Sequence, residues 1–312
     1  MSVLSLPAQV TPAPAAALRP VPWHRMIWVT WRQHRGMLIG LTAVYAAVSA
    51  FLLIAGLKAH HAYAAVASCH PAISDACNTL NNNFGSTYWT MANTTGIFMN
   101  LLPALVGAFT GAQILAAELE TGTFRYAWTQ GIGRIRWTIA KLTLLAVVIT
   151  VLSWAFSQLF AWFYDPFLGR SAGLTVLAEG VFDTRGIDFA ARTLVAFTIG
   201  AFLGMLIRRT VPAMAATLGV YLGLKLLVWL VLREDYPVAI NTSGAVPLNT
   251  QQSAPATMPW ILKTWTVGTT NWTRYIPVSR FWPMQFIESG WLLLLSVLLI
   301  AATVHLVRRR AA

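Results

Sequence analysis

Residues 142–163 read LTLLAVVITVLSWAFSQLFAWF and contain no charged side chain. An α-helix rises about 1.5 Å per residue, so this stretch would be about 33 Å long as a helix. That length is enough to cross the hydrocarbon core of a bilayer, which is about 30 Å thick. The stretch therefore predicts a transmembrane helix.

Similar apolar runs recur along the chain. With 57% hydrophobic and only 10% charged residues among 312, the protein has too little polar surface to cover a soluble globule. The predicted fold class is an all-α polytopic membrane protein with six transmembrane helices. These spans are expected at about 37–57, 97–117, 142–163, 189–207, 211–232 and 286–307.

The charges predict the orientation of these spans. One side receives 13 of the 22 Lys and Arg and two acids, a net 13 − 2 = +11, whereas the other side nets about 8 − 7 = +1. Basic loops stay in the cytoplasm, so both termini are predicted to be cytoplasmic and the outer loops to be 58–96, 164–188 and 233–285. We expect a multi-pass protein of a bacterial cell membrane. The formal charge of +12 is explained by anionic lipid and indicates no nucleic-acid partner.

The N-terminal region precedes the first span. Residues 1–21, rich in Ala and Pro, have no basic start followed by an apolar core, so they predict a disordered cytoplasmic tail rather than a signal peptide. Residues 22–312 are then the transmembrane domain. The stretch 21–36, VPWHRMIWVTWRQHRG, places tryptophans among basic residues at helical spacing, which predicts an interfacial helix. The alternative is a cytoplasmic extension of the first span.

The usual sequence signs of enzyme chemistry are absent. The chain has no GxxxxGK[ST], HExxH, GxSxG or CxxC pattern. Histidines of the first outer loop fit no standard metal spacing, so no metal site is predicted. The only cysteines, Cys69 and Cys77, lie in that loop, where an oxidising compartment permits a disulfide; two free thiols are the alternative.

Some residues inside the spans are unusual for lipid. Lys225 and Glu288 fall at similar expected depths in the fifth and sixth spans, where an isolated charge is costly. We expect Glu288 to pair with Lys225, or with Arg192 of the fourth span; the alternative is that each side chain extends outward to water. GxxxG patterns, which favour close helix packing, occur at Gly107/Gly111, Gly200/Gly204 and Gly219/Gly223.

The cytoplasmic stretch 116–137, AAELETGTFRYAWTQGIGRIRW, contains two of the ten acidic residues. After Glu118 and Glu120, residues 121–131 predict a short separate helix with Phe124 and Trp128 on one face. The carboxylates favour the start of that helix and can also pair with basic residues across the turn. The candidate basic partners are Arg134, Arg136 and Lys141.

With this stretch, the chain resembles the membrane subunits of type-2 ABC exporters. In that family the cytoplasmic loop between the second and third spans contains an acidic residue, Gly-Thr, a short coupling helix and a basic start to the third span. The matching residues here are Glu118, Glu120, Gly122, Thr123, Arg134, Arg136 and Lys141. The interfacial helix and the six spans extend the likeness over most of the chain.

The resemblance implies an ATP-driven exporter whose ATPase is a separate subunit docked on the coupling helix, with Phe124 and Trp128 as the contact residues. Two permease chains, a homodimer or a heterodimer, would form the pathway. ATP and magnesium would bind the partner, so this chain is expected to need no cofactor and to be no enzyme. The family's outer segment between the last two spans often forms short re-entrant helices. A polytopic membrane enzyme and a non-transporting sensor or scaffold remain the alternatives.

Overall fold

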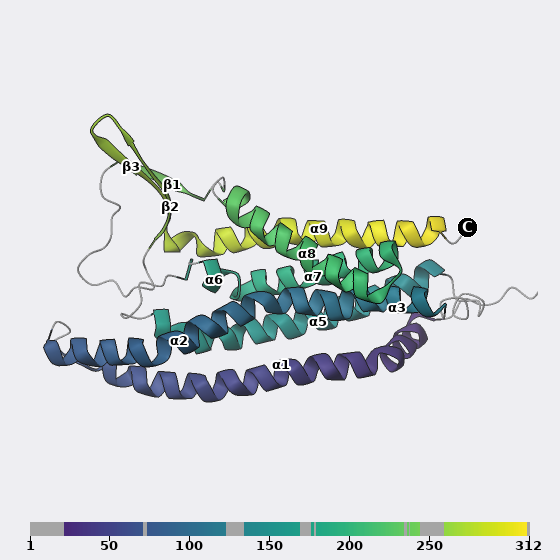
Figure 1. The fold of residues 1–312 in the computed structure, drawn as a ribbon, viewed down its shortest axis with the longest axis horizontal. Coiled ribbons are helices and arrows are strands. Elements are labelled where there is room, and N and C mark those ends of the chain that lie inside the picture. Colours follow the sequence, from purple (N-terminus) through teal and green to yellow (C-terminus); the bar gives the residue numbers. More distant parts are fainter. Residues whose placement is uncertain are drawn as a thin grey trace, which may run out of the picture.

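The computed structural model describes residues 22–70, 74–122, 134–168, 176–177, 179–233, 236, 238–243 and 259–310. Within them, six helices are long and apolar enough to cross a membrane, which confirms the all-α polytopic fold (Figure 1). They are α1 (Trp23–Ala67); α2 (Asp75–Val106) with η1 (Gly107–Ala112) and α3 (Gln113–Thr121); α5 (Arg134–Tyr164); α7 (Gly186–Ile207); α8 (Thr210–Leu227) with η3 (Val228–Leu232); and α9 (Phe281–Arg310). Of the predicted coupling helix at 121–131, Thr121 is the last residue of α3 and Gly122 follows it, while the rest lies outside the described residues.

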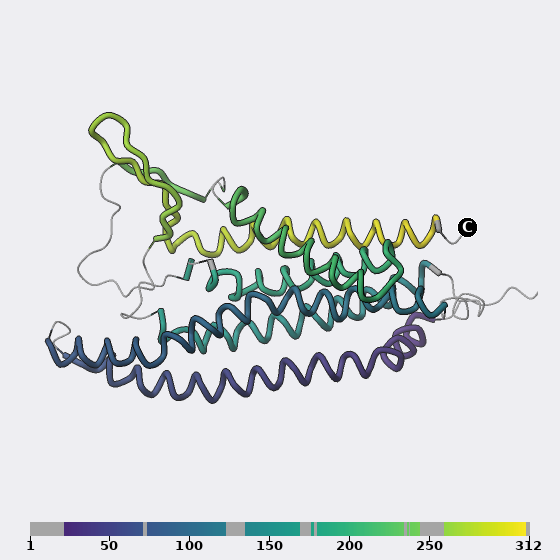
Figure 2. The backbone as a smooth tube through the Cα atoms, in the orientation of Figure 1, coloured from purple at the N-terminus to yellow at the C-terminus, as the bar shows by residue number. Residues whose placement is uncertain are grey.

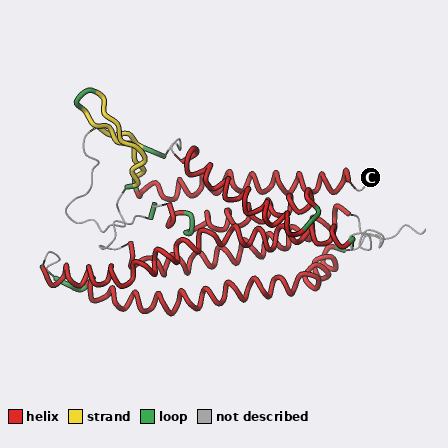
Figure 3. The backbone as a smooth tube through the Cα atoms, viewed as in Figure 1, coloured by secondary structure: helices red, strands yellow, loops and turns green. Residues whose placement is uncertain are grey.

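The long helices run roughly parallel, and the two ends of the bundle differ (Figures 1 and 2). One end contains the start of α1, the α7–α8 turn and the end of α9. We call it the basic end because Arg208, Arg209, Arg308 and Arg309 lie there. The opposite end, the sheet end, contains all the strands (Figure 3). The two ends of the described helical bundle, at Trp23 and Arg310, therefore lie on the same side, as six crossings require.

Several helices are longer than a bilayer is thick. α1 has 45 residues, so it is about 67 Å long. Residues 58–96, predicted as the first outer loop, are therefore mostly helical: α1 continues to Ala67 and α2 begins at Asp75, where the Ser74 hydroxyl accepts a hydrogen bond from the Cys77 backbone N–H. A search for apolar runs detects only the part of a helix that lies in lipid. The predicted interfacial stretch is likewise part of α1, whose first turns bend away from the rest (Figure 2).

The centre of the bundle is formed by α7 packed against η1 and α3. A Cβ atom at Gly107 would lie 2.5 Å from the Ala196 carbonyl oxygen, and one at Gly204 would lie 2.5 Å from the Ala112 carbonyl oxygen. Gly111 and Gly200 are equally close to the facing backbone. Two of the three GxxxG patterns thus pack against each other, in the middle of the most buried span.

A small antiparallel sheet follows α8, within residues 233–285, which were predicted as an outer loop. It consists of β1 (Ile240–Ser243), β2 (Trp260–Val267) and β3 (Thr270–Ile276) in the order β1-β3-β2. Threonine and aromatic residues favour strands, and Gly268, at φ 62°, suits the first central position of a two-residue hairpin turn. Shorter elements complete the sheet end: η2 (Asp165–Leu168), α6 (Glu179–Phe182) and η6 (Val278–Arg280).

Candidate functional site

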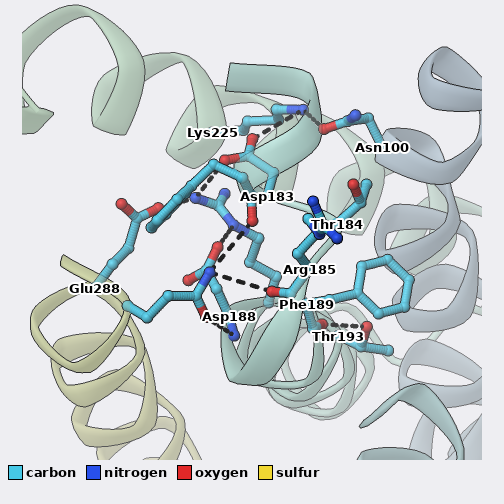
Figure 4. Close-up of polar contacts among 12 residues, drawn as sticks. Asn100, Asp183, Thr184, Arg185, Asp188, Phe189, Thr193, Lys225 and Glu288 are labelled. Atoms are coloured by element: carbon cyan, nitrogen blue, oxygen red, sulfur yellow. Dashed lines mark hydrogen bonds and ion pairs between the residues drawn. The ribbon is translucent and has the colours of Figure 1, made fainter. Parts of the chain in front are cut away.

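A cluster of buried charges lies at the sheet end of the bundle, between four helices (Figure 4). The α6–α7 turn contributes a carboxylate, α7 contributes a carboxylate and a guanidinium, and the outer part of α8 contributes an ammonium. A guanidinium directly after η3 and a carboxylate of α9 complete it. In chain order the residues are Asp183, Asp188, Arg192, Lys225, Arg233 and Glu288.

The two arginines bridge the three carboxylates. Arg192 Nε lies 2.5 Å from Asp188 Oδ2, one turn earlier on the same helix, and its Nη2 contacts Asp183 at 3.2 Å as well as Glu288. Arg233 Nη2 contacts Asp183 and lies 2.9 Å from Glu288 Oε1, while its Nε donates to Glu288 Oε2 at 3.2 Å. All five side chains are at most 4% exposed. The cluster therefore connects α6, α7, α8 and α9 through contacts that exclude water.

One neutral side chain fixes the turn that presents these acids. Gln285 of α9 accepts a hydrogen bond from the Asp188 backbone N–H at 3.0 Å and donates to the Arg185 carbonyl oxygen at 3.2 Å. Gly186, at φ 65°, lies so close that a Cβ would approach Gln285 Oε1 to 2.8 Å. Glycine is required there both by the left-handed backbone and by this contact.

The charges balance within the cluster. Three carboxylates face three cations, so the group has no net charge and avoids the cost of an unpaired buried ion. Burial by itself would raise the pKa of Asp183, but the nearby Arg192, Arg233 and Lys225 outweigh burial and hold that pKa well below its usual range. Burial raises the pKa of Tyr236, whose hydroxyl donates to Glu288 at 3.4 Å. Asp183 therefore remains an ionised partner of the arginines.

The same three acids have the spacing of a metal site. Asp183, Asp188 and Glu288 each offer an oxygen within 4.8 Å of the others. However, Arg192 and Arg233 direct their guanidinium groups at these oxygens and supply the positive charge that a cation would bring. The arrangement is suited to binding guanidinium groups rather than a metal ion.

The structure shows which partners the predicted intramembrane charges contact. Glu288 contacts Arg192, the second of the two expected partners, whereas Lys225 lies 3.5 Å from Asp183 and donates to Asn100 Oδ1 at 2.6 Å (Figure 4). Asp183 and Arg233 were missed in the sequence because they stand outside the apolar runs and read as exposed loop charges.

At the basic end, Glu118 joins three spans. It lies in the last turns of α3, pairs with the fully buried Lys141 of α5, and accepts a hydrogen bond from Gln33 Nε2 of α1 at 2.7 Å. Lys141 also contacts the Ile114 carbonyl oxygen at 3.4 Å. The two helices on either side of residues 122–133 are therefore fastened together.

Glu120 joins α3 to a different span. Its Oε2 accepts hydrogen bonds from the Thr210 backbone N–H at 2.9 Å and from the Thr210 hydroxyl at 2.7 Å, so it caps the start of α8. Glu118 and Glu120 thus lie inside a helix that ends at Gly122, which adopts the left-handed conformation at φ 71°.

The remaining predicted coupling residues are only partly described. Arg136 lies 4.9 Å from the centre of the Trp23 ring, which connects α5 to the start of α1. Arg134 is the first residue of α5. Thr123, Phe124 and Trp128 lie outside the described residues. At the other end of the molecule, Cys69 and Cys77 form a disulfide, with Cα atoms 5.7 Å apart, that closes the tip between α1 and α2.

The six apolar spans define a multi-pass membrane protein. The charges buried between these spans pair with one another. Residues 42–233, more than half of the chain, match the family model described as ABC-2 membrane transporter related, so the chain belongs to that family as an ABC-2 type permease subunit. Such permeases are typically non-enzymatic subunits of ABC transporters, and the family implies an ATPase partner. No curated protein and no solved structure matches the chain.

Proposed function

We propose that this permease is the membrane-spanning subunit of an ATP-driven exporter and that its ATPase subunit docks on residues 122–133. The observation that supports this docking site best is the contact between Glu118 and Lys141. It fastens the helix that enters the segment to the helix that leaves it, so a push on the segment moves α3 and α5 together. A loosely attached loop would absorb such a push.

The proposed orientation places the basic end in the cytoplasm. Arg208 and Arg209 at the α7–α8 turn, and Arg308 and Arg309 at the end of α9, lie at the same end as the arginines at the start of α1. Cytoplasmic loops are enriched in such residues, and anionic lipid attracts them. The proposed location is a bacterial cell membrane with both termini inside.

ATP and magnesium belong on the partner in this proposal, and the permease contributes the surface that receives the movement. The proposed coupling residues are Glu118, Glu120, Gly122, Thr123, Phe124, Trp128, Arg134, Arg136 and Lys141. Interhelical contacts at the basic end are made by Glu118, Glu120, Arg136 and Lys141.

Two copies are proposed to pack through α8. Gly219 and Gly223 form the third GxxxG pattern, but a Cβ at either would meet nothing within 4 Å, unlike the glycines of the first two patterns. Large apolar side chains beside them, such as Val220 and Leu222, are 49% and 42% exposed. Small residues on a lipid-facing helix permit a close approach of a second helix. A homodimer places this surface against its own copy.

The dimer is tested by cross-linking in native membranes. Because Cys69 and Cys77 are joined to each other, a cysteine introduced as Gly219→Cys should be the only free thiol and should cross-link two copies. Gly40→Cys on α1, also with nothing within 4 Å of its Cβ position, is the matched control and should remain monomeric. Equal cross-linking at both sites would contradict an α8 interface.

The exporter itself is tested by capture of a tagged chain co-expressed with the ATPase subunit of a neighbouring reading frame. The ATPase should co-purify, and Glu118→Gln should weaken ATP-driven transport at normal membrane abundance. Lys141→Met, which removes the other charge of the pair, should have the same effect. A chain that never retains an ATPase would instead favour a sensor or a membrane enzyme.

A further inference from the structure

Few side chains of α8 are fixed by packing. The position of this span therefore depends strongly on the contacts at its two ends. Between Thr210 and Leu227 only Ala213, Thr217 and Tyr221 are buried. In contrast, α7 is buried along most of its length and shares backbone contacts with α3. α8 therefore contacts η1, α3 and α7 through a narrow face that includes Ala213 and Tyr221.

Polar contacts fix the two ends of α8 instead. At the sheet end, Lys225 contacts Asp183, and Arg233, just after η3, contacts both Asp183 and Glu288. These groups are nearly all buried, so this anchor is shielded from water. At the basic end, the carboxylate of Glu120 accepts hydrogen bonds from Thr210, and Gln113 Nε2 of α3 makes a longer contact, 3.7 Å, with Met214 Sδ of α8.

The start of α8 has no side-chain cap of its own. The N-cap residue, Arg209, is extended at φ −129° and ψ 129°, and its side chain makes no capping hydrogen bond. Arg208 before it is left-handed at φ 60°, the only non-glycine residue with positive φ among those described. A non-glycine residue in this left-handed backbone conformation costs about 1 kcal/mol. The α7–α8 turn is therefore strained, and the cap that satisfies the first N–H of α8 comes from α3.

This cap lies next to the proposed ATPase contact. Glu120 is two residues before Gly122, where the docking segment begins. Glu120 therefore links the helix that leads into the docking segment to the first residue of α8, while the far end of α8 is held in the buried cluster.

We propose that Glu120 is a positioning residue that transmits movement of the cytoplasmic segment to α8, and that α8 turns about the buried charge cluster at its sheet end. This inference deepens the proposed exporter function and rests on it. The exposed carboxylate is the contact that moves, and the buried cluster is the pivot.

The test measures each end of α8 separately, by distances between pairs of spin labels in the full chain in lipid vesicles. One pair, Ala215→Cys on α8 and Ile135→Cys on α5, reports the basic end. The other, Leu230→Cys and Leu293→Cys on α9, reports the sheet end. All four positions are exposed, and the native cysteines are in a disulfide.

Glu120→Gln should broaden the distance distribution at the basic end and leave the sheet end unchanged. An unchanged basic end, or equal broadening at both ends, would overturn the proposal. A second variant separates transmission from simple capping: Glu120→Gln with Arg209→Asp supplies a cap from α8 itself without the link to α3. In this double variant the distance distribution at the basic end should remain broad. Return to the narrow wild-type distribution would show that Glu120 only caps the helix.

The same labels report the coupled movement once the ATPase is added. With the captured ATPase and ATP, the basic-end distance should shift in the wild type and not in Glu120→Gln. If no ATPase is captured, the proposed exporter function fails, whereas the distances measured without ATPase still decide whether Glu120 positions α8. The two failures are thus distinguishable.

Discussion

At the scale of single residues, Glu288 connects both arginines of the buried cluster. It is fully buried and accepts hydrogen bonds from Arg192, Arg233 and Tyr236. Removing its charge leaves Arg192, Lys225 and Arg233 facing only two aspartates. Breaking a buried ion pair on one side costs about 3–5 kcal/mol. Glu288→Gln keeps the size and some hydrogen bonds, so we expect a loss of about 3 kcal/mol in unfolding free energy, measured as a lower thermal midpoint in detergent.

The matched control for this prediction is Asp165→Asn. Asp165 pairs with Arg185 at 2.5 Å, but its side chain is 54% exposed. Exposed pairs are worth about 0–1 kcal/mol, so the midpoint should hardly change. A double-mutant cycle should further show strong coupling of Glu288 with Arg192 and little with Lys225, which contacts Asp183 instead. Equal losses for Glu288→Gln and Asp165→Asn would contradict the account of the cluster.

The sequence predicted part of this cluster for a physical reason. Lys225, Arg192 and Glu288 stand out because each interrupts an apolar run, where a charge needs a partner. Asp183 and Arg233 do not, because a charge beside a span is the common pattern of an exposed loop. Their burial depends on how α6 and the segment after η3 fold back over α9, and that tertiary arrangement is not encoded in local periodicity.

At the scale of elements, the glycines test how closely the helices pack. Gly111 faces the Phe197 carbonyl oxygen at a distance that no Cβ can adopt. Gly111→Ala should therefore separate η1 from α7 and destabilise the protein by about 1–3 kcal/mol. Gly40→Ala on α1, outside the proposed dimer interface, is the control, because a Cβ there meets open space. The thermal midpoint should fall only in the first variant, and a similar fall in both would contradict the packing seen here.

The tip of the α1–α2 hairpin is a second element with its own prediction. Cys69 and Cys77 are eight residues apart, and closing so small a loop is worth about 2–3 kcal/mol to the local structure. Cys69→Ser with Cys77→Ser should therefore speed amide hydrogen exchange near Ala67 and Asp75 while the bundle keeps its thermal midpoint. Ready alkylation of both native cysteines without a reductant would contradict the bridge.

The elements were predictable to different degrees. Apolar length located all six spans, since the bilayer imposes that length on each crossing. The helical parts beyond the bilayer and the strands after α8 were not located, because neither has an apolar run. The three GxxxG patterns look alike in sequence. In two of them neighbouring backbone occupies the space beside the glycines, whereas in the third that space is open. This difference depends on the surrounding helices.

At the scale of the whole molecule, contacts connect the two ends of the bundle. From residues 122–133 one route passes through Glu118 to Lys141 of α5, and another passes through Glu120 to Thr210 of α8. α8 in turn ends in the buried cluster, which also includes residues of α7 and α9. The two ends of the bundle are therefore linked through helices, with the buried cluster as the fixed end of α8, and in the proposed function movement begins at the ATPase contact.

Phe124 and Trp128 are the predicted contact residues, so their replacement tests the whole arrangement. Buried aromatic side chains at an interface contribute about 2 kcal/mol or more, so Phe124→Ala with Trp128→Ala should weaken ATPase binding about 30-fold. The permease itself should insert and fold normally. Trp28→Ala is the control, because Trp28 is a 58% exposed aromatic residue near the start of α1.

The competing interpretation is that Phe124 and Trp128 only anchor the segment at the lipid boundary, as aromatic residues often do. In that case membrane abundance and the thermal midpoint should fall first, and the protein that remains should bind its ATPase and transport normally. Measuring ATPase capture, membrane abundance and stimulated ATP hydrolysis on the same variants separates the two. Loss of capture at normal abundance supports coupling, because an anchor would fail in the membrane before it failed at the partner. Normal capture and normal stimulation by the double variant would show that the ATPase contacts the permease elsewhere.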